Sequence, residues 1–265
     1  MDATGDCFVD FADFAVFAEQ WLTEGIPSEP GVMVWVSISE PNFTGEMSKY
    51  ETTNAQYCQF LNAALASGDI NVSGNDAIGA VGSNGGADYA GELYYDGDGA
   101  GVSVNGANNG GAARIHYISG VFTVDPNFEN HPVTQVTWYG SAAFCNYYGY
   151  RLPTQAEWRA VADFNDSYLY GCGITINNSI ANYWNSAHLD GTAIVGAFGT
   201  YGYGVCDMAG NAFEWTSSTY IDDYGTYRIM CGGNWASLDY NCAVSAWSYG
   251  VPGSTNASRG FRVCR

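Results

Sequence analysis

Apolar residues recur along the chain at two spacings, and each spacing predicts a different kind of element. Residues 32–38 form an apolar run with β-branched members and predict a strand. Residues 54–66 carry apolar side chains at helical spacing and predict a helix. A second helix is expected at about residues 138–148. A third begins by Thr154, which forms a capping box with Glu157.

The remaining pattern is dominated by loops. Residues 67–113 are dense in Gly, Asn, Asp and Ser and predict long loops with short hairpins. Two apolar runs, residues 115–118 and 121–124, flank Ser119-Gly120 and predict a hairpin. After residue 162 the sequence favours loops with short strands. Two or three helices, short strands and long connections indicate an α+β fold.

Residues 1–24 form an acidic segment in which oxygen-bearing residues alternate as in an EF-hand loop that wraps calcium. The pattern resembles one half of a type I dockerin repeat, although Cys7 replaces the expected glycine and no second copy follows. The alternative is an acidic helical hairpin packed on the main domain. The residues implied as calcium ligands are Asp2, Thr4, Asp6, Phe8 through its carbonyl, Asp10 and Asp13.

Domain boundaries follow from this segment. Residues 25–30, with two prolines in the surrounding stretch, predict a linker, and residues 31–265 predict the main domain. Because Met1 leads directly into the calcium-loop pattern, we expect the natural chain to be longer at this end.

The net charge of the chain limits the classes of partner that the protein is expected to bind. The chain has 265 residues, 47% of them hydrophobic, and 8 Lys and Arg oppose 27 Asp and Glu for a formal net charge of -19. Such a chain repels phosphate backbones and anionic lipid, so nucleic-acid binding is not expected. No apolar segment is long enough for a membrane span, so membrane insertion is not expected either, and no signal peptide is visible. The charge would attract divalent cations, or serves solubility alone.

A series of short motifs in a fixed order resembles the formylglycine-generating enzyme and sulfatase-modifying factor family. The resemblance covers roughly residues 31 to 265 and implies a variant of the C-type lectin fold. The motifs lie at residues 47–57 (MSKYETTNAQY), 130–133 (NHPV), 151–154 (RLPT), 207–215 (DMAGNAFEW), 232–235 (GGNW) and 260–262 (GFR).

The resemblance implies two calcium sites built from hard oxygen ligands. The alternative is that Asn211 and Glu214 hydrogen-bond their loop without a metal. The first implied site comprises Asp207, Gly210, Ala212 and Glu214. The second, which aligns more loosely, comprises Asn182, Tyr183, Asp190 and Thr192.

The resemblance also bears on whether this chain binds copper. The family's oxidases convert a substrate cysteine to formylglycine with two cysteines, five positions apart, that hold Cu(I), an ion that selects thiolates. Here the second position is Cys242 and the first is Ser237, whose hydroxyl is a poor Cu(I) ligand. Copper is therefore not expected, and no catalytic residue is assigned. Cys242 is predicted to be buried or disulfide-bonded, unless an oxidase recruits another thiol.

Residues 234–258 contain no Lys, Arg or Glu and are rich in Ala, Ser, Tyr, Gly and Asn. The segment resembles the region rewritten in the variable proteins of diversity-generating retroelements, which share this fold. Tyr240, Trp247 and Tyr249 would anchor a ligand if exposed, and would be core residues otherwise. The candidate ligand-binding residues are Ser237, Leu238, Asp239, Tyr240, Ala243, Ala246, Trp247, Ser248, Tyr249, Gly250, Val251 and Ser254.

Three functions therefore compete. The first is a non-enzymatic protein, displayed on the cell surface or secreted, that recognises a protein or surface ligand through its C-terminal segment. The second is a formylglycine-type copper oxidase that uses Cys242. The third is a structural or assembly module that docks through the N-terminal calcium segment.

Overall fold

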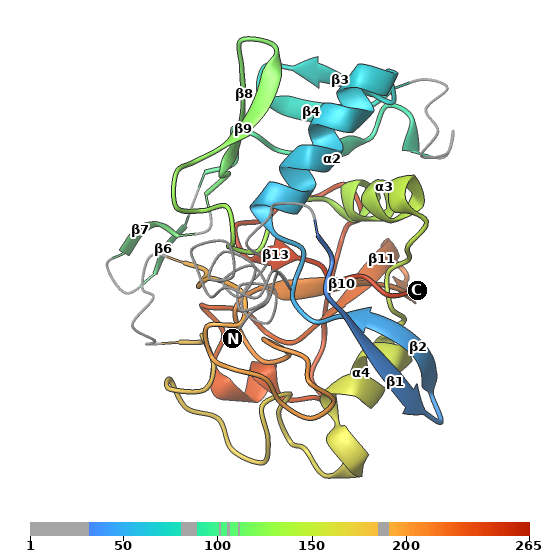
Figure 1. Cartoon of the computed structure of the whole chain (residues 1–265), viewed down its shortest axis with the longest axis vertical. Helices are drawn as coiled ribbons and strands as arrows, with labels where there is room; N and C mark the ends of the chain where they lie inside the picture. The colour runs from blue at the N-terminus through green and yellow to red at the C-terminus, as the bar shows by residue number, and fades with distance from the viewer. Residues whose placement is uncertain (1–31, 81–88, 101, 105–106, 111, 185–190) are drawn as a thin grey trace, which may run out of the picture.

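A computed structural model describes residues 32–80, 89–100, 102–104, 107–110, 112–184 and 191–265. The expected calcium segment 1–24, the linker 25–30 and Asp190 lie outside the described residues, so these assignments stay predictions. Within the described part, helices and short strands are joined by long connections, as an α+β fold requires (Figure 1).

The helices are α2 (Asn54–Ser67), α3 (Trp138–Tyr148), α4 (Gln155–Ala162) and the 3-10 turns η2 (Phe164–Asp166) and η3 (Asp239–Cys242). The strands are β1 (Trp35–Glu40), β2 (Phe43–Ser48), β3 (Ile70–Ser73), β4 (Asp76–Gly79), β5 (Leu93–Tyr95), β6 (Val102–Val104), β7 (Ala107–Gly110), β8 (Ile115–Ile118), β9 (Val121–Val124), β10 (Phe213–Asp222), β11 (Gly225–Cys231), β12 (Ser248–Gly250) and β13 (Arg259–Gly260). The three expected helices and the hairpin at residues 115–124 are confirmed, and the expected strand at residues 32–38 begins at Trp35.

Local sequence signals set the helix boundaries. The Thr53 side chain accepts from the Gln56 amide, the Gln56 side chain accepts from the Thr53 amide, and this capping box starts α2. Gly68 ends α2 in the left-handed conformation with φ of 81°, which glycine adopts without steric cost. Thr154 and Glu157 form the same reciprocal box at the start of α4, as the sequence predicts.

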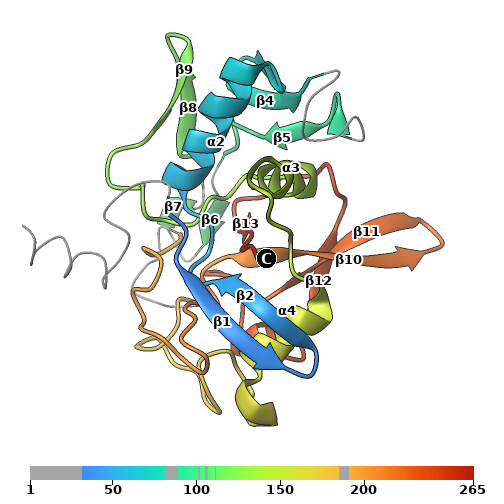
Figure 2. The same ribbon diagram turned by 45° about the vertical axis from the view of Figure 1, so that its right-hand side comes forward.

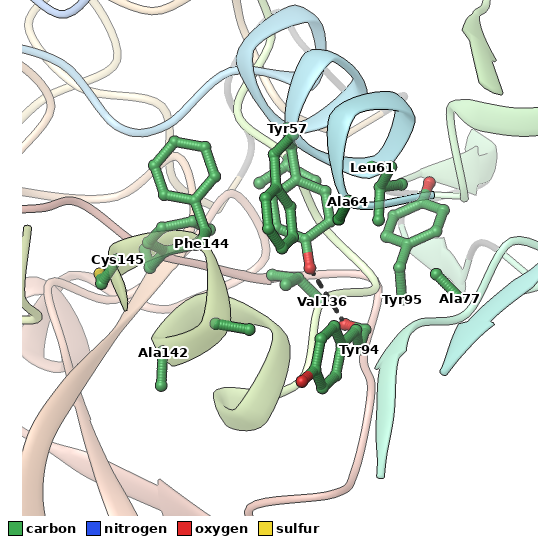
Figure 3. Close-up of a cluster of buried hydrophobic side chains, with 14 of the residues drawn as sticks. Tyr57, Leu61, Ala64, Ala77, Tyr94, Tyr95, Val136, Ala142, Phe144 and Cys145 are labelled. Atoms are coloured by element: carbon green, nitrogen blue, oxygen red, sulfur yellow. Dashed lines mark hydrogen bonds between the residues drawn. The ribbon is translucent and has the colours of Figure 1, made fainter. Parts of the chain in front are cut away.

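The main core lies between α2 and α3. Side chains from one face of α2 meet aromatic rings from α3 and β5, and Figure 3 shows Tyr57, Leu61 and Ala64 facing Tyr94, Tyr95 and Phe144. The Tyr57 hydroxyl donates to the Tyr94 carbonyl at 3.4 Å, so the buried phenol is satisfied. This core holds α2, α3 and β5 together at one end of the molecule.

The central sheet has the strand order β12-β11-β10-β13. β10 and β11 form an antiparallel hairpin, β12 pairs antiparallel with β11, and β13 pairs parallel with β10. Both views place this sheet between the α2–α3 end and the end formed by β1, β2 and α4 (Figures 1 and 2). The strand order sets residues 248–250 at an edge of the sheet, beside a hairpin that comes earlier in the chain.

A buried arginine joins the motifs that the sequence analysis singled out. The Arg262 side chain is 0% exposed. Its guanidinium donates two hydrogen bonds to the Glu214 carboxylate, from Nε at 2.6 Å and from Nη2 at 2.7 Å. Trp158 Nε1 donates to the same carboxylate at 2.6 Å. Arg262 also donates to the carbonyl oxygens of Ser48 and Cys206. Four regions far apart in the sequence, around residues 48, 158, 206–214 and 262, therefore meet at one ion pair.

No described helix is long and apolar enough to span a membrane.

Replacing Arg262 by leucine should lower the free energy of unfolding by about 3–5 kcal/mol, because the Glu214 carboxylate would remain buried without its partner. Urea denaturation measures the change. Arg265→Leu is the matched control, because Arg265 pairs with Glu46 where both side chains are partly exposed. That loss should stay below about 1 kcal/mol. Equal losses in the two variants would contradict the central place of Arg262.

Candidate functional site

Three carboxylates gather around Arg262 in the interior. Besides Glu214, they are Asp207 and Glu51, all less than one-tenth exposed. Burial raises the pKa of Glu51 well above its ordinary value, and the neighbouring Asp207 and Glu214 charges raise it further. Burial likewise raises the pKa of Asp207 to about 6. One guanidinium thus faces up to three negative charges.

Sequence reasoning did not assign Glu51, although it lies within the first family motif. Its carboxylate accepts from the Ala212 amide at 2.9 Å and from the Asn211 side chain. The sequence signal for Glu51 was a carboxylate within a family motif, just before the start of a helix. A solvent-exposed glutamate without a function would fit the same pattern. Only the packing of α2's entry against the loop at residues 207–212 shows that Glu51 belongs to this cluster.

The two loops expected to bind calcium lie side by side. The Asn211 amide donates to the Asn182 carbonyl at 2.7 Å, and Asn182 Nδ2 donates to Asn211 Oδ1 at 3.1 Å. Thr192 Oγ1 lies 3.1 Å from His131 Nδ1, and Tyr183 is half-buried among apolar residues. The Asn211 side chain therefore hydrogen-bonds the neighbouring loop through Asn182 and Ala193, whereas the Glu214 carboxylate accepts from Arg262 and Trp158 instead.

The donors fit calcium in type, but Glu214 does not fit as a ligand in position. Carboxylates and carbonyls are the ligands that calcium prefers, and the excess negative charge favours a divalent cation. The Glu214 carboxylate, however, already accepts from Arg262 and Trp158. Asp207 Oδ2 accepts from the Gly196 amide at 2.6 Å. In the described part of the chain, no three His, Cys, Asp or Glu side chains form a group that could hold a metal. Calcium stays a prediction.

The two positions that the resemblance implies for copper ligands, Ser237 and Cys242, are both buried. Ser237 Oγ accepts from the Asn234 amide at 3.0 Å, and the Cys242 thiol donates to the Leu238 carbonyl at 3.7 Å. Burial raises the pKa of Cys242 to about 12, and the neighbouring Cys172 contributes. A thiol with this pKa stays protonated near neutral pH unless a bound metal lowers its pKa.

Cys172 is the second sulfur near this place, and it comes from a distant part of the chain. It packs with Cys242, Ala181 and Ala209 in a small buried cluster. Burial raises the pKa of Cys172 to about 11. The cysteines of the described residues are buried free thiols. Two thiols therefore share one cluster, and both are protonated at neutral pH.

A pocket of about 410 Å³ opens beside these residues. Its walls come from the motif at residues 232–235, from the start of the C-terminal segment and from Trp184. Ser237, although 6% exposed, and Leu238 line it. The remaining lining residues are Asn234, Trp235, Ala236, Asn241 and Ser258.

Four aromatic rings form a second feature, here called the aromatic cluster: Tyr220, Tyr227, Trp247 and Tyr249. Ring centroids of Tyr220 and Tyr249 are 4.7 Å apart, and those of Tyr227 and Tyr249 are 5.0 Å apart. Trp247 lies 5.5 Å from Tyr220. Trp247 and Tyr249 are 43% and 44% exposed, so neither is a core residue. Sequence reasoning missed Tyr220 and Tyr227, whose signal was their place near the two ends of a short turn.

The candidate ligand-binding residues separate into three groups by burial. Leu238, Asp239, Tyr240, Trp247, Tyr249 and Val251 are exposed. Ala246, Ser248 and Ser254 are half-buried. Ser237, Ala243 and Gly250 are buried, and of these three Ser237 lines the pocket described above.

Gly250 is buried for a steric reason. A Cβ at Gly250 would lie 2.9 Å from the Trp215 ring and 3.0 Å from Arg259 Nη1. A larger residue would therefore require the Trp215 ring, the Arg259 side chain or the sheet edge to shift. Gly250 is therefore part of the frame rather than of the contact surface. Trp235, 3% exposed, is a core residue as expected.

The sulfatase-modifying factor enzyme 1-like domain matches residues 38–265. The chain belongs to this family. It is 34% identical over 170 residues to a serine/threonine-protein kinase pkn1 of Chlamydia caviae, a match that covers 58% of this chain and 27% of the kinase. It is 30% identical over 166 residues to the formylglycine-generating enzyme of Thermomonospora curvata, covering 50% of this chain and 55% of the enzyme.

The family fold extends to a solved structure without close sequence identity. Treponema denticola variable protein 1 superposes with a TM-score of 0.54 at 16% identity, over 89% of this chain and 92% of that one. This likeness shows a shared fold and confirms the lectin-like architecture that the motifs imply. The matches to curated relatives span only part of those proteins, so activity does not follow from them.

Cys242 should resist alkylation in the folded protein. Iodoacetamide attacks thiolates, and a raised pKa leaves few of them at about pH 8. Mass spectrometry after a short labelling pulse should find Cys242 unmodified in the native protein and modified after unfolding. Rapid native labelling would instead show an exposed, activated thiol.

Calcium, if bound by Asp207 and its neighbours, should raise the melting temperature of protein previously stripped with chelator, because binding to the native state alone stabilises it. Thermal melts with calcium and with magnesium measure the shift. The Asp207→Asn variant should lose most of the calcium effect, whereas the N-terminal Asp6→Asn variant reports on the other expected loop. A melting temperature indifferent to both ions would contradict calcium at either place.

Proposed function

We propose that this protein recognises a ligand without transforming it, through the aromatic cluster and the exposed residues of segment 234–258. The observation that carries the proposal is a group of rings, half-exposed at Trp247 and Tyr249, on the edge of a sheet that the rest of the fold fixes. Large exposed aromatic side chains on a rigid support are typical of binding surfaces, because their contact area comes at low rotamer cost.

The support of this surface is independent of its contact residues. β12 pairs with β11 through Arg228–Gly250, Ile229–Tyr249 and Met230–Ser248, so backbone hydrogen bonding sets the place of Tyr249. Gly250 closes against Trp215 behind the sheet. Side chains that project outward from residues 238–240, 247, 249 and 251 can therefore change without altering the frame.

Family membership does not favour catalysis by itself. The family includes a protein of Mus musculus named inactive C-alpha-formylglycine-generating enzyme 2, which is 29% identical to this chain over 147 residues. In this chain, Ser237 stands where the resemblance implies the first copper-binding thiol, and a hydroxyl is a poor Cu(I) ligand. This replacement supports recognition over oxidation.

We further propose that segment 234–258 is diversified, as in the variable proteins of retroelements. Its support is the shared fold with the Treponema variable protein together with the alternation of frame and exposed residues. The ligand would be a protein or a surface ligand, and the protein would act outside the cell or on its surface. A near-identical template copy of the segment in the source genome, differing at adenines, would support diversification.

A copper oxidase is the second candidate, and one observation favours it. Cys172 packs against the cluster that contains Cys242, so a second sulfur is present near the expected place. Purified protein loaded with copper should then oxidise a cysteine peptide with oxygen, and Cys172→Ser and Cys242→Ser should each abolish turnover. The recognition proposal expects no turnover in the wild type. Docking through residues 1–24 is a third hypothesis, and it lies outside the described residues.

Selection of a displayed random-peptide library on the immobilised protein tests recognition. We expect enriched binders whose affinity falls at least about tenfold in the Trp247→Ala and Tyr249→Ala double variant, because hot-spot aromatics commonly contribute 2 kcal/mol or more. Tyr224→Ala is the matched control, because Tyr224 is 91% exposed at the hairpin turn and has no ring contact among those of the aromatic cluster.

The outcomes are separable. Binders that are lost in the double variant and kept in the control support the proposal. Binders that keep full affinity for the double variant would place recognition elsewhere, and a melting curve of each variant checks that the fold is intact.

A further inference from the structure

We propose that the aromatic cluster binds a cationic protein segment, whose arginine or lysine side chains stack on its exposed rings. This inference rests on the proposed recognition function and names the chemical class of its ligand. It is carried by ring geometry, by the distribution of charge around the rings, and by the place of the nearest basic side chains.

The rings form one continuous face. Tyr220 and Tyr227 are direct partners across the β10–β11 hairpin, and Tyr249 is opposite Ile229 on the next strand. Tyr227 and Tyr249 meet edge-on with an interplanar angle of 62°. Tyr220 packs inward against the apolar core cluster that contains Ile229, so the inner side of the face is supported. Its outer side consists of half-exposed aromatic rings.

The arginines of the sheet itself are directed away from the face. Arg228 lies between Tyr227 and Ile229, and successive side chains of a strand point to opposite sides. Its guanidinium stacks 3.6 Å over the Trp138 ring and donates to the Ser217 carbonyl. Arg259 Nη1 lies 3.0 Å from the place of a Cβ at Gly250, the residue paired with Arg228, so it is on the same side as Arg228. Arg159 of α4 is a further basic group, and its Nη2 donates to the carbonyl of Ser245, two residues before Trp247, at 2.7 Å.

The surrounding chain contributes negative charge. From Ile229 to Ser258 it has no Lys or Arg and one carboxylate, Asp239. The hairpin turn beside Tyr227 contains Asp222 and Asp223. Asp222 Oδ1 accepts from the amides of Tyr224 and Gly225, which fixes its carboxylate at the turn. Partial burial first, and then the Asp222 charge, raises the pKa of Tyr227, so this carboxylate acts on the cluster.

These features favour a positively charged ligand. The face of an aromatic ring carries negative potential and attracts guanidinium and ammonium groups. A chain with a formal net charge of -19 draws cations and repels anions at longer range. Arginine suits the site particularly well, because its planar group stacks on rings and is weakly hydrated. A neutral ligand would gain from the rings but not from the carboxylates.

The test compares two synthetic peptides with the same backbone and nearly the same shape. One alternates arginine with glycine, and the other replaces each arginine by citrulline, which keeps the planar group and removes the charge. Fluorescence anisotropy of labelled peptide measures the dissociation constant. We expect the arginine peptide to bind at least about tenfold more tightly. Added salt should weaken the arginine peptide and leave the citrulline peptide unchanged.

Two variants assign the binding to the rings. Trp247→Leu with Tyr249→Leu keeps apolar side chains and removes the ring faces, and it should abolish the preference for arginine over citrulline. Tyr249→Phe keeps a ring and should retain it. Thermal melts of all variants confirm that they fold. Equal affinity for the two peptides, or an arginine preference that survives the double leucine variant, would overturn the inference.

Failure of this inference is distinguishable from failure of the recognition function. If library selection returns binders that require Trp247 and Tyr249 but have no excess of arginine or lysine, recognition stands and the cationic ligand is wrong. If such binders are neutral or acidic peptides, the ligand belongs to another class. If no binder depends on the two rings, recognition through this surface fails as well.

Discussion

The ion pair between Arg262 and Glu214 is the interaction on which the rest of the structure depends. It is fully buried, and its guanidinium reaches carbonyl oxygens of two further segments. Buried pairs of this kind add little net stability, yet breaking one leaves a charge in a medium that cannot solvate it. The pair therefore constrains how α4, β10 and the C-terminal strand meet. It holds in place the sheet that supports the aromatic cluster.

The same sheet separates tightly packed residues from exposed residues that can be substituted. On one side it contains Gly250, where an added side chain would crowd Trp215 and Arg259. Its outer face presents rings and small polar residues whose contacts are local. A binding surface built this way tolerates new side chains because they do not enter the packing beneath. This physical separation, more than any single contact, supports recognition as the function.

Negative charge has two different consequences in this molecule. In the interior, Glu51, Asp207 and Glu214 exceed the one guanidinium that faces them, and burial raises the pKa of the first two. Protonation or a bound cation would relieve that excess. At the surface, the carboxylates near the hairpin turn are solvated, and their charge attracts cationic groups of an approaching ligand. One composition thus produces an internal electrostatic constraint and an external preference for cations.

The sequence alone determined the family and the helices, because motifs and caps are local properties. It also identified Trp247 and Tyr249 as candidates, but left open whether they lie in the core. Only the tertiary structure decided that they are exposed, that Tyr220 and Tyr227 join them, and that Glu51 belongs with Asp207. It also showed that Gly250 is confined and that Cys172 lies near Cys242. These facts depend on contacts between residues far apart in the chain, and periodicity within a segment does not encode which distant segment will cover it.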